Sequence, residues 1–368
     1  MIIFIAFSVL YILFLLWSRW HWMRIQTPQK SVQEVRFSII VPIRNEQENI
    51  EGLLQSLLAQ DYPKETYEVI IINDQSEDDT HEVVNRFIQN NGLNWILHNV
   101  PSEESGGKKN AITKGVELAQ FEYIVTTDGD CAVEPGWLNA YAAAYCKSEK
   151  VMVSAPVKMK GFNWFTRLQS IEFGGLIGIG AATLQSGNPT MCNGANLSYK
   201  KSVFEEVEGY KGNDNIPSGD DEFLLQKVFK KYPNAVSFLK VPEAIVQTDA
   251  KASLMELVNQ RVRWSSKWKF HKSMFIKLMA MFIFMNYLSL IVGGLESFSD
   301  QALLPFIGVL FIRWLALLYF SYPLAQFFRI SGVVWLSLLL EIIYPFFVIF
   351  LGIASIFAKY SWKGRYYS

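Results

Sequence analysis

Residues 123–131, YIVTTDGDC, decide the fold of this chain. A short apolar run ends in two threonines and then stops at two carboxylates separated by one glycine. The run predicts a buried central strand, because β-rich segments that are apolar on both faces are typical of parallel sheets. Glycine lets the chain turn Asp128 and Asp130 toward one point, where carboxylate oxygens suit Mg²⁺ or Mn²⁺. Since an Asp-Gly-Asp by itself is more often a surface turn, the surrounding sequence must decide between the two.

The sequence before this stretch alternates between β-branched runs and amphipathic segments. The runs predict strands at residues 37–42, 68–73, 95–98 and 123–127. The amphipathic segments predict helices at residues 46–60, 80–89 and 109–119. This alternation is typical of right-handed βαβ units and predicts an α/β fold with a mostly parallel sheet.

Polar clusters follow the predicted strands, at residues 44–46, 74–79, 106–109 and 128–130. In open sheets of this class, ligands bind beyond the carboxyl ends of the strands, so the clusters predict one site. Lys108 follows two glycines at a helix start and can approach an anion closely, although a solvated helix end is the alternative for it alone. Asp74 can accept a hydrogen bond from a base or a ribose. Asp128 and Asp130 can hold a metal that neutralises a leaving diphosphate.

Three segments follow the predicted sheet. Residues 161–187 crowd apolar side chains between few charges and predict a helix, either at a membrane interface or in a buried core. Residues 193–196, NGAN, are small and polar, which suits close approach of the backbone to a ligand. Residues 220–222 are three acids at the start of an amphipathic helix. The helix dipole accounts for any one of them, but such a cluster is also a natural place for a general base.

Apolar segments at both ends predict an integral membrane protein. Residues 1–17 carry no charge and precede several basic residues, which predicts an uncleaved anchor whose C-terminal end is cytoplasmic. Residues 278–295, 302–320 and 333–357 are each long enough to span a bilayer. If they run outward, inward and outward, Arg313 and Glu341 lie at similar depth on neighbouring spans and are predicted to pair.

The basic tail, residues 359–368, does not suit that topology. An outward third span would leave its Lys and Arg residues outside, against the positive-inside tendency. A re-entrant segment near Pro305, Pro323 or Pro345 would return the tail to the cytoplasm, and both alternatives stay open.

Composition excludes several other classes of protein. Lys and Arg number 34 and Asp and Glu number 34, so no nucleic-acid partner is expected. The three cysteines show no CxxC spacing and are expected to be free thiols. The four histidines are scattered, which argues against a His-ligated metal.

Residues 260–264, QRVRW, lie in a basic aromatic segment before the last apolar region and predict a helix at a membrane surface.

The ordered set of motifs resembles the family 2 inverting glycosyltransferases, which have the GT-A nucleotide-sugar-binding fold, in their membrane-embedded form. The matching stretches are SIIVPIRNEQENI (38–50), VIIINDQSEDDT (69–80), GGKKNAITKG (106–115), DGD (128–130), NGAN (193–196), GDDEFLL (219–225) and QRVRW (260–264). The last fits the QxxRW pattern, and the resemblance covers about 36–272. The WKGR of the tail is similar to that of lipid-modifying members.

The resemblance implies a role for each matching residue. Asp221 is the implied catalytic base, although Gly219 and Asp220 replace the more usual Thr and Glu before it. Asp130 is the implied metal ligand, together with Asp128 as first acid of the DxD. The implied nucleotide-binding residues are Pro42, Asn45, Glu46, Asp74, Lys108 and Asp128. The implied acceptor and diphosphate residues are Asn196, Asp220, Gln260, Arg263 and Trp264.

The resemblance also implies the organisation and function of the whole chain. We expect an anchor at 1–20, a GT-A domain at 36–250, an interfacial helix at 251–272, about three membrane helices at 274–358 and a tail at 359–368. The expected activity transfers a sugar from a nucleotide sugar, with UDP expected, to a lipid hydroxyl at the cytoplasmic face, with inversion and a divalent metal. A processive polysaccharide synthase acting on a glycan is the alternative. A non-catalytic membrane scaffold or flippase subunit is the alternative from another class. The expected partners are the donor, a lipid or glycan acceptor and membrane lipid.

Overall fold

The computed structural model describes residues 1–28, 34–103, 106–146, 148–213, 219–299, 302–357, 360–362 and 365–367. The chain forms two compact units, each built from separate stretches of sequence. The sheet unit comprises Ile25–Lys158 and Met191–Asp249, and the helical unit comprises Met1–Arg24, Met159–Thr190 and Ala250–Ser368. Residues 159–190, which lie inside the expected 36–250 domain, therefore group with the apolar helices. Part of the expected basic tail lies outside the described residues.

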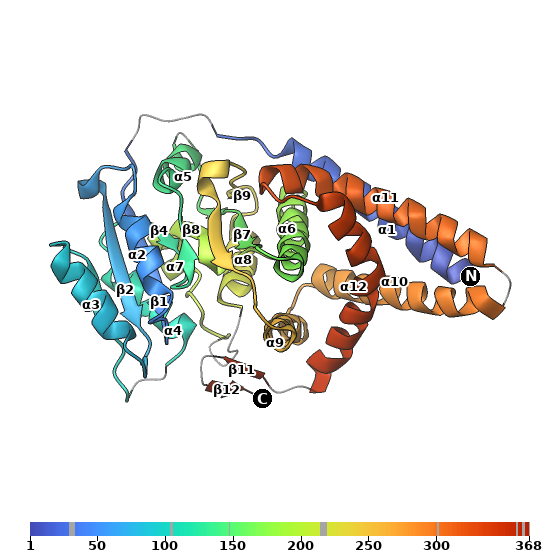
Figure 1. Cartoon of the computed structure of the whole chain (residues 1–368). Helices are drawn as coiled ribbons and strands as arrows, with labels where there is room; N and C mark the ends of the chain where they lie inside the picture. Colours follow the sequence, from blue (N-terminus) through green and yellow to red (C-terminus); the bar gives the residue numbers. More distant parts are fainter. Residues whose placement is uncertain are drawn as a thin grey trace. The chain divides into compact units, whose positions relative to one another are not determined.

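A seven-stranded sheet runs through the sheet unit, in the order β3-β2-β1-β4-β8-β6-β9 (Figure 1). Its strands are β1 (Phe37–Ile43), β2 (Tyr67–Asn73), β3 (Ile96–Asn99), β4 (Tyr123–Thr126), β6 (Met152–Ser154), β8 (Leu197–Lys200) and β9 (Val236–Phe238). β1 pairs in parallel with β2 and β4, and β2 with β3, whereas β8 is antiparallel to β4 and β6. Every residue of β1 is buried, as expected for a strand covered on both faces. The predicted α/β fold with a mostly parallel sheet is confirmed.

Short helices connect these strands. They are α2 (Ile50–Leu58), α3 (Thr80–Asn90), α4 (Lys108–Leu118), α5 (Trp137–Tyr145), α7 (Lys201–Glu206) and α8 (Asp220–Lys231), with the single turns η1 (Lys64–Thr66), η2 (Gly194–Asn196) and η3 (Pro242–Ala244). α4 packs on β1 and β2. α2 begins later than predicted, because Asn45 has a left-handed backbone with a φ of 50° and turns the chain first. A smaller sheet joins β5 (Cys131–Ala132), β10 (Val246–Asp249) and β7 (Val157–Lys160) in that order.

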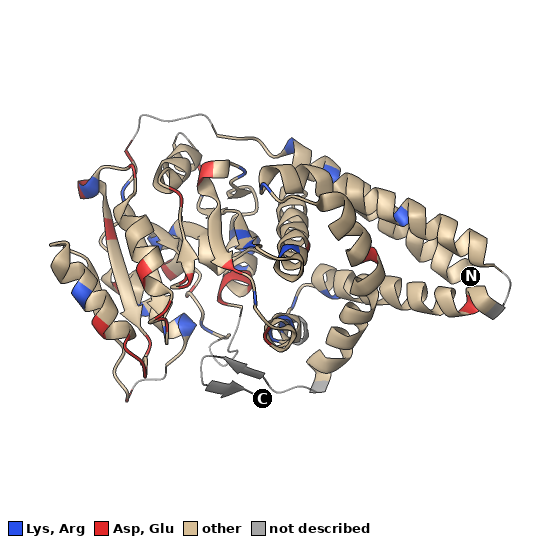
Figure 2. Ribbon diagram, in the orientation of Figure 1, with Lys and Arg blue, Asp and Glu red and all other residues tan. Residues whose placement is uncertain are grey.

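The helical unit contains α1 (Ile2–Arg24), α6 (Trp164–Gln185), α9 (Leu254–Ser265), η4 (Ser266–Phe270), α10 (Met274–Ser299), α11 (Leu303–Phe327), α12 (Val333–Phe357) and the hairpin β11 (Tyr360–Trp362) and β12 (Arg365–Tyr367). α1, α10, α11 and α12 are long and apolar enough to cross a membrane. Figure 2 shows few charged residues on them. α6 is mostly buried against α1, α11 and α12, which supports the buried-core alternative for most of its length.

α12 does not run alongside the other apolar helices but crosses them (Figure 1). It begins just after α11 ends, and it leads into β11, which packs against α9, the helix before α10. Both ends of α12 therefore lie at the end of the helical unit where α11 finishes and α10 begins. This course brings the end of α12 back toward α9 and the start of α10, and the side of the membrane on which the tail lies stays a prediction. The helix stays continuous through Pro345.

The predicted pairing of Arg313 with Glu341 is confirmed. Arg313 Nε lies 2.7 Å from Glu341 Oε1, and the two side chains are 0% and 1% exposed. Arg313 Nη1 also donates to Asn286 Oδ1 at 2.8 Å and to Ser8 Oγ at 3.3 Å. The guanidinium lies 4.4 Å from the centre of the Tyr11 ring. One buried cation thus joins α1, α10, α11 and α12.

Replacing Arg313 or Glu341 alone by leucine is expected to lower the free energy of unfolding by about 3–5 kcal/mol, because the other charge stays buried without its partner. The double change Arg313→Leu with Glu341→Leu removes both charges and is expected to lose less than the sum of the two single losses. Thermal unfolding in detergent compares the three variants with the wild type. If the loss in the double variant equals the sum of the two single losses, the two side chains do not act as a pair.

Candidate active site

Lys108 lies at the centre of the candidate site in the sheet unit. Its Nζ is 2.7 Å from Asp128 Oδ1 and 3.3 Å from Asp220 Oδ2. The three side chains come from the start of α4, the turn after β4 and the start of α8. Burial alone would lower the pKa of Lys108, but Asp128 and Asp220 outweigh it and raise that pKa above its usual value. Lys108 is therefore a cation held between two acids that are distant in sequence.

Two glycines with left-handed or open backbones let the helices begin here. Gly107 has a φ of 133°, and its N–H donates to both carboxylate oxygens of Asp74, at 2.9 and 3.0 Å. Gly219 has a φ of 82° directly before α8, a conformation that favours glycine. Asp74 therefore fixes the loop that presents Lys108, and Gly219 lets Asp220 begin the helix.

Asp221 is the predicted base, and the structure supports it with backbone donors. Its Oδ2 accepts from the N–H of Gly194 at 3.0 Å, and its Oδ1 accepts from the N–H of Glu222 at 2.8 Å. These bonds orient the carboxylate. The side chain is half-buried, so it can still reach a ligand. Asp221 also adds to the negative charge around Lys108.

Gly194 leaves no room for a side chain. A Cβ there would lie 2.8 Å from Asp220 Oδ2 and 3.4 Å from Lys108 Nζ. The NGAN motif is thus small because its backbone packs against the ion pair.

Asn196 does not act as predicted. Its Oδ1 accepts from Trp137 Nε1 at 2.9 Å and from Tyr141 Oη at 2.8 Å. Its Nδ2 donates to the carbonyls of Pro156 and Ala244, both at 2.7 Å. The side chain is 0% exposed, and these bonds use its full capacity. We therefore revise its role from contacting the acceptor to holding the NGAN turn in place.

The loops after β1 and β2 brace each other. Asn45 and Gln75 both have left-handed backbones, with φ of 50° and 55°, which are uncommon outside glycine and often mark functional loops. Asn45 Oδ1 accepts from the N–H of Glu77 at 2.9 Å. Arg44 Nη1 donates to the carbonyls of Asp74, at 2.9 Å, and of Gln75. Its Nη2 also pairs with Glu77 Oε1 at 2.6 Å. Arg44 was part of the first polar cluster but not among the predicted site residues, because no local pattern shows that it joins the two loops.

Pro42 and Glu46 support these loops from inside. The Ile40 carbonyl accepts a hydrogen bond from the N–H of Thr127, the residue after β4. Because alternate residues of a strand face the same side, the Pro42 nitrogen also faces this side, but beyond the last residue pair of β1 and β4. Its missing N–H therefore interrupts no ladder bond. Glu46 is 4% exposed, and its backbone N–H donates to Thr80 Oγ1 at 2.7 Å.

The Asp128-Gly129-Asp130 turn offers oxygens that suit a divalent cation. A Cβ on Gly129 would lie 3.0 Å from both Glu46 Cγ and Ile43 Cγ2, so a larger residue between the acids would have to displace these two side chains. Burial raises the pKa of the neighbouring Cys131, as do Asp130 and Asp128, which favours the neutral thiol. Among the described residues, no three Asp, Glu, His or Cys side chains are grouped to hold an ion. A cation here would need further oxygens from a bound diphosphate, and the two acids fit that requirement.

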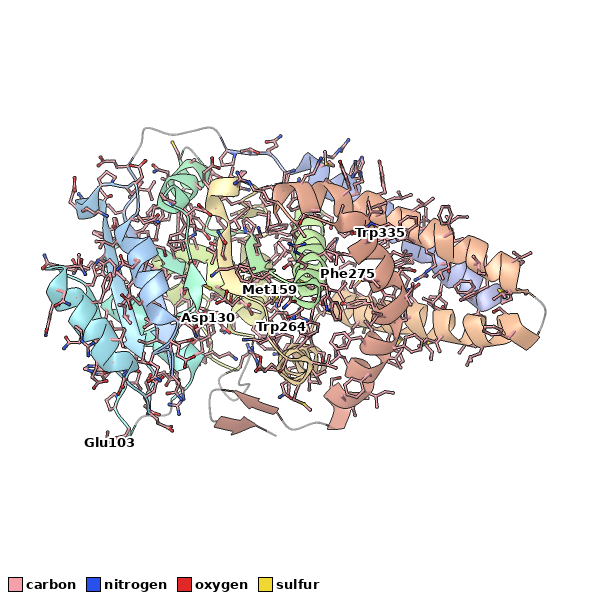
Figure 3. The ribbon with its side chains drawn as sticks, viewed as in Figure 1. Glu103, Asp130, Met159, Trp264, Phe275 and Trp335 are labelled. Atoms are coloured by element: carbon pink, nitrogen blue, oxygen red, sulfur yellow. The ribbon has the colours of Figure 1, made fainter. Side chains whose placement is uncertain are left out.

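The QRVRW residues belong to the helical unit. Gln260, Arg263 and Trp264 lie on α9, and Figure 3 labels Trp264 there and Asp130 in the sheet unit. The Trp264 ring packs against Phe173 of α6, with 5.7 Å between ring centres. Their role toward an acceptor stays a prediction.

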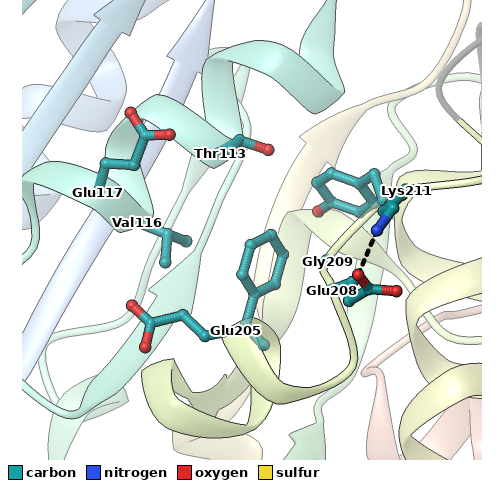
Figure 4. Close-up of a pocket in the computed structure, with 9 residues that line it drawn as sticks. Thr113, Val116, Glu117, Glu205, Glu208, Gly209 and Lys211 are labelled. Atoms are coloured by element: carbon teal, nitrogen blue, oxygen red, sulfur yellow. Dashed lines mark hydrogen bonds and ion pairs between the residues drawn. The ribbon is translucent and has the colours of Figure 1, made fainter.

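The sheet unit also has a pocket between α4 and the α7 region, and none of the predicted site residues discussed above lines it in the part of the chain that the structure describes (Figure 4). Its lining includes Glu117, Glu205, Glu208 and Lys211, of which Glu208 and Lys211 form an ion pair.

Comparison with known proteins shows to which family a large part of the chain is similar. Residues 38–208 match the family model described as Glycosyl transferase family 2. Residues 38–208 therefore form a glycosyltransferase domain of this family, and the resemblance found in the motifs is confirmed for these residues. A poly-beta-1,6-N-acetyl-D-glucosamine synthase of Staphylococcus epidermidis is 28% identical over 235 residues, covering 62% of this chain and 53% of the relative. The synthase of Staphylococcus aureus (strain COL) is 29% identical over 249 residues, covering 65% and 56%.

The chain spans about half the length of these curated relatives. Among solved structures, a mannosyltransferase from Pyrobaculum calidifontis in complex with GDP-Man and Mn²⁺ matches with a TM-score of 0.62 and 18% identity. The match covers 93% of this chain and 98% of that one. At this identity the likeness shows the fold alone, which is GT-A-like.

Gly194→Ala is expected to weaken nucleotide-sugar binding by about tenfold, because overpacking of a filled site typically costs about 1–3 kcal/mol. The added methyl group would push on Asp220 and Lys108. Gly52→Ala in α2 is the matched control, since a Cβ there meets nothing within 4 Å. Titration calorimetry with UDP- and GDP-sugars measures both variants. Equal binding by the two would show that the Lys108 cluster does not contact the donor.

Proposed function

We propose that this protein is a membrane-bound inverting glycosyltransferase that moves a sugar from a nucleotide sugar, UDP-linked in our expectation, to a lipid hydroxyl at the cytoplasmic membrane face. The observation that carries the proposal is the cluster of Lys108, Asp128, Asp220 and Asp221 in a family 2 domain. It puts a cation for a diphosphate beside an oriented carboxylate that can accept a proton.

The reaction is a single displacement. Asp221 takes the proton of the acceptor hydroxyl while that oxygen forms a bond to the anomeric carbon. The bond from this carbon to the diphosphate oxygen breaks, and the electron pair leaves with the nucleoside diphosphate. Lys108 balances part of the charge that develops on the leaving group. Because attack and departure occur on opposite faces, the anomeric configuration inverts.

Asp128 and Asp130 are the residues that would hold Mg²⁺ or Mn²⁺. The acids near Lys108 outnumber its single positive charge, and a nucleoside diphosphate adds more negative charge. A divalent cation supplies the balancing charge on the leaving diphosphate when it is bound. The fold relative from Pyrobaculum calidifontis, solved with GDP-Man and Mn²⁺, supports this part of the proposal.

Asp74, Asn45, Glu46 and Pro42 are proposed to shape the nucleotide pocket. Their loops lie at the carboxyl ends of β1 and β2, where ligands of such sheets bind. On the resemblance to the QxxRW motif, Gln260, Arg263 and Trp264 are proposed to serve the acceptor.

A lipid acceptor is supported by the helical unit. Phe162 and Trp164 at the start of α6 are 79% and 67% exposed, and Leu254 and Met255 at the start of α9 are 62% and 69% exposed. Exposed aromatic and apolar side chains on such helices suit a membrane interface. Among the described helices long enough to cross a membrane, α12 crosses the others and only α1, α10 and α11 run alongside one another, which does not favour a channel for a polymer.

A processive polysaccharide synthase is the second candidate. The Staphylococcus relatives, which are named as poly-beta-1,6-N-acetyl-D-glucosamine synthases, favour it. In that case the acceptor is the growing glycan and the donor carries N-acetylglucosamine. The residues around Lys108 would act in the same way in both candidates.

Asp221→Asn is expected to lower the rate of sugar transfer by about 10²–10⁴-fold, because the amide cannot accept the proton. Membranes carrying the chain are incubated with Mn²⁺ and labelled nucleotide sugars, including UDP-GlcNAc and GDP-Man. Glu222→Gln, one position further along α8, is the matched control and is expected to stay active.

The products are then partitioned between organic solvent and water. Label that enters the organic phase only with intact Asp221 supports the glycolipid transferase and identifies the donor. Asp221-dependent polymer supports the synthase instead. Absence of Asp221-dependent label with every donor would contradict both.

A further inference from the structure

Arg261, the second residue of the QRVRW motif, forms a buried ion pair inside the helical unit. Its Nε and Nη2 donate to Glu172 Oε1 at 3.3 Å and Oε2 at 2.5 Å. The side chains of Arg261 and Glu172 are 4% and 9% exposed. This two-point contact of a guanidinium with a carboxylate joins α9 to the middle of α6 and fixes both groups in one orientation.

Arg261 in turn holds two other residues of the motif. Its Nη1 donates to Gln260 Oε1 at 2.6 Å. Its guanidinium lies 4.4 Å from the centre of the Trp264 ring, whose other neighbour is Phe173 on α6. The side chains of Gln260 and Trp264 are therefore both positioned by one arginine.

Tyr344 extends the cluster to the crossing helix α12. Its hydroxyl donates to Glu172 Oε1 at 3.0 Å. Glu172 thus accepts hydrogen bonds from α9 and from α12 at once. A buried carboxylate is stable only when its oxygens are satisfied in this way, so the three side chains depend on one another.

We infer that Glu172, Arg261 and Tyr344 are positioning residues for the acceptor. They hold Gln260 and Trp264 in the geometry that orients the acceptor hydroxyl. The inference rests on the proposed function, which assigns the acceptor to these motif residues. The proposed nucleotide-binding residues belong to the sheet unit, so a change in the cluster should alter use of the acceptor and leave binding of the nucleotide unchanged.

The first variant is Glu172→Gln, which keeps the shape of the side chain and removes its charge. It is expected to raise the KM for the acceptor or lower kcat by about tenfold or more, since misplacing a group by ~1 Å can cost about a hundredfold in rate. The KM for the donor, and the slow release of nucleotide without acceptor, should match the wild type. An equal change in both KM values would overturn the inference, as would wild-type kinetics.

The second variant, Tyr344→Phe, tests the inference if Glu172→Gln does not fold, because it removes only one hydroxyl group. It is expected to shift the acceptor KM in the same direction, by less than Glu172→Gln. Tyr322→Phe on α11, whose side chain is exposed, is the matched control. Unfolding temperatures in detergent verify that each variant is folded.

The double variant Glu172→Gln with Arg261→Gln tests whether the two residues act together. If they do, the double variant loses no more acceptor use than the worse single variant, whereas additive losses would contradict the coupling. The wild type separates the two levels of the argument. Transfer by the wild type with no acceptor effect in any variant refutes the positioning role alone. No transfer by the wild type refutes the proposed function and the role that rests on it.

Discussion

The Lys108 ammonium between Asp128 and Asp220 is the interaction on which the candidate site depends. It draws together the start of α4, the turn after β4 and the start of α8, which are far apart in sequence. Two glycines allow this arrangement. Gly107 adopts a positive φ directly before α4, and Gly194 has no Cβ that would press on Asp220 and Lys108. In the proposed reaction, a bound diphosphate would compete with Asp128 and Asp220 for the same ammonium. Donor binding is therefore expected to exchange one set of charges for another around a residue that stays protonated.

The helical unit also depends on ion pairs between side chains that are distant in sequence. A charge inside an apolar group of helices must find a partner, and for both buried pairs described above the partner comes from another helix. Arg313 joins four helices through Glu341, Asn286 and Ser8. Glu172 joins α6, α9 and α12 through Arg261 and Tyr344. Such pairs fix which faces of the helices meet, because sliding one helix would leave a buried charge without its partner.

Local patterns in the sequence were enough to predict the strands and the polar clusters at their ends. They also marked Lys108, Asp128 and Asp221, which the structure brings close together and whose roles stay predictions. The Arg313–Glu341 pair was also predictable, because a lone charge in hydrocarbon needs a partner at its own depth. Side chains whose role depends on tertiary contacts were not predictable. Asn196 looks like a ligand residue in the NGAN motif, yet four buried partners use its amide completely. The contact of Arg261 with Glu172 links residues 89 positions apart, and no local pattern marks it.

A structure of the protein with a bound nucleotide sugar and Mn²⁺ would test the central role of Lys108 most directly. We expect the diphosphate to lie against Lys108 Nζ, and the distance from this nitrogen to Asp128 Oδ1 to grow beyond its present 2.7 Å. Asp221 should keep its bond to the Gly194 N–H and face the anomeric carbon. A nucleotide bound elsewhere, such as in the pocket beside Glu117 and Glu208, with both Lys108 ion pairs unchanged, would contradict the central role of Lys108.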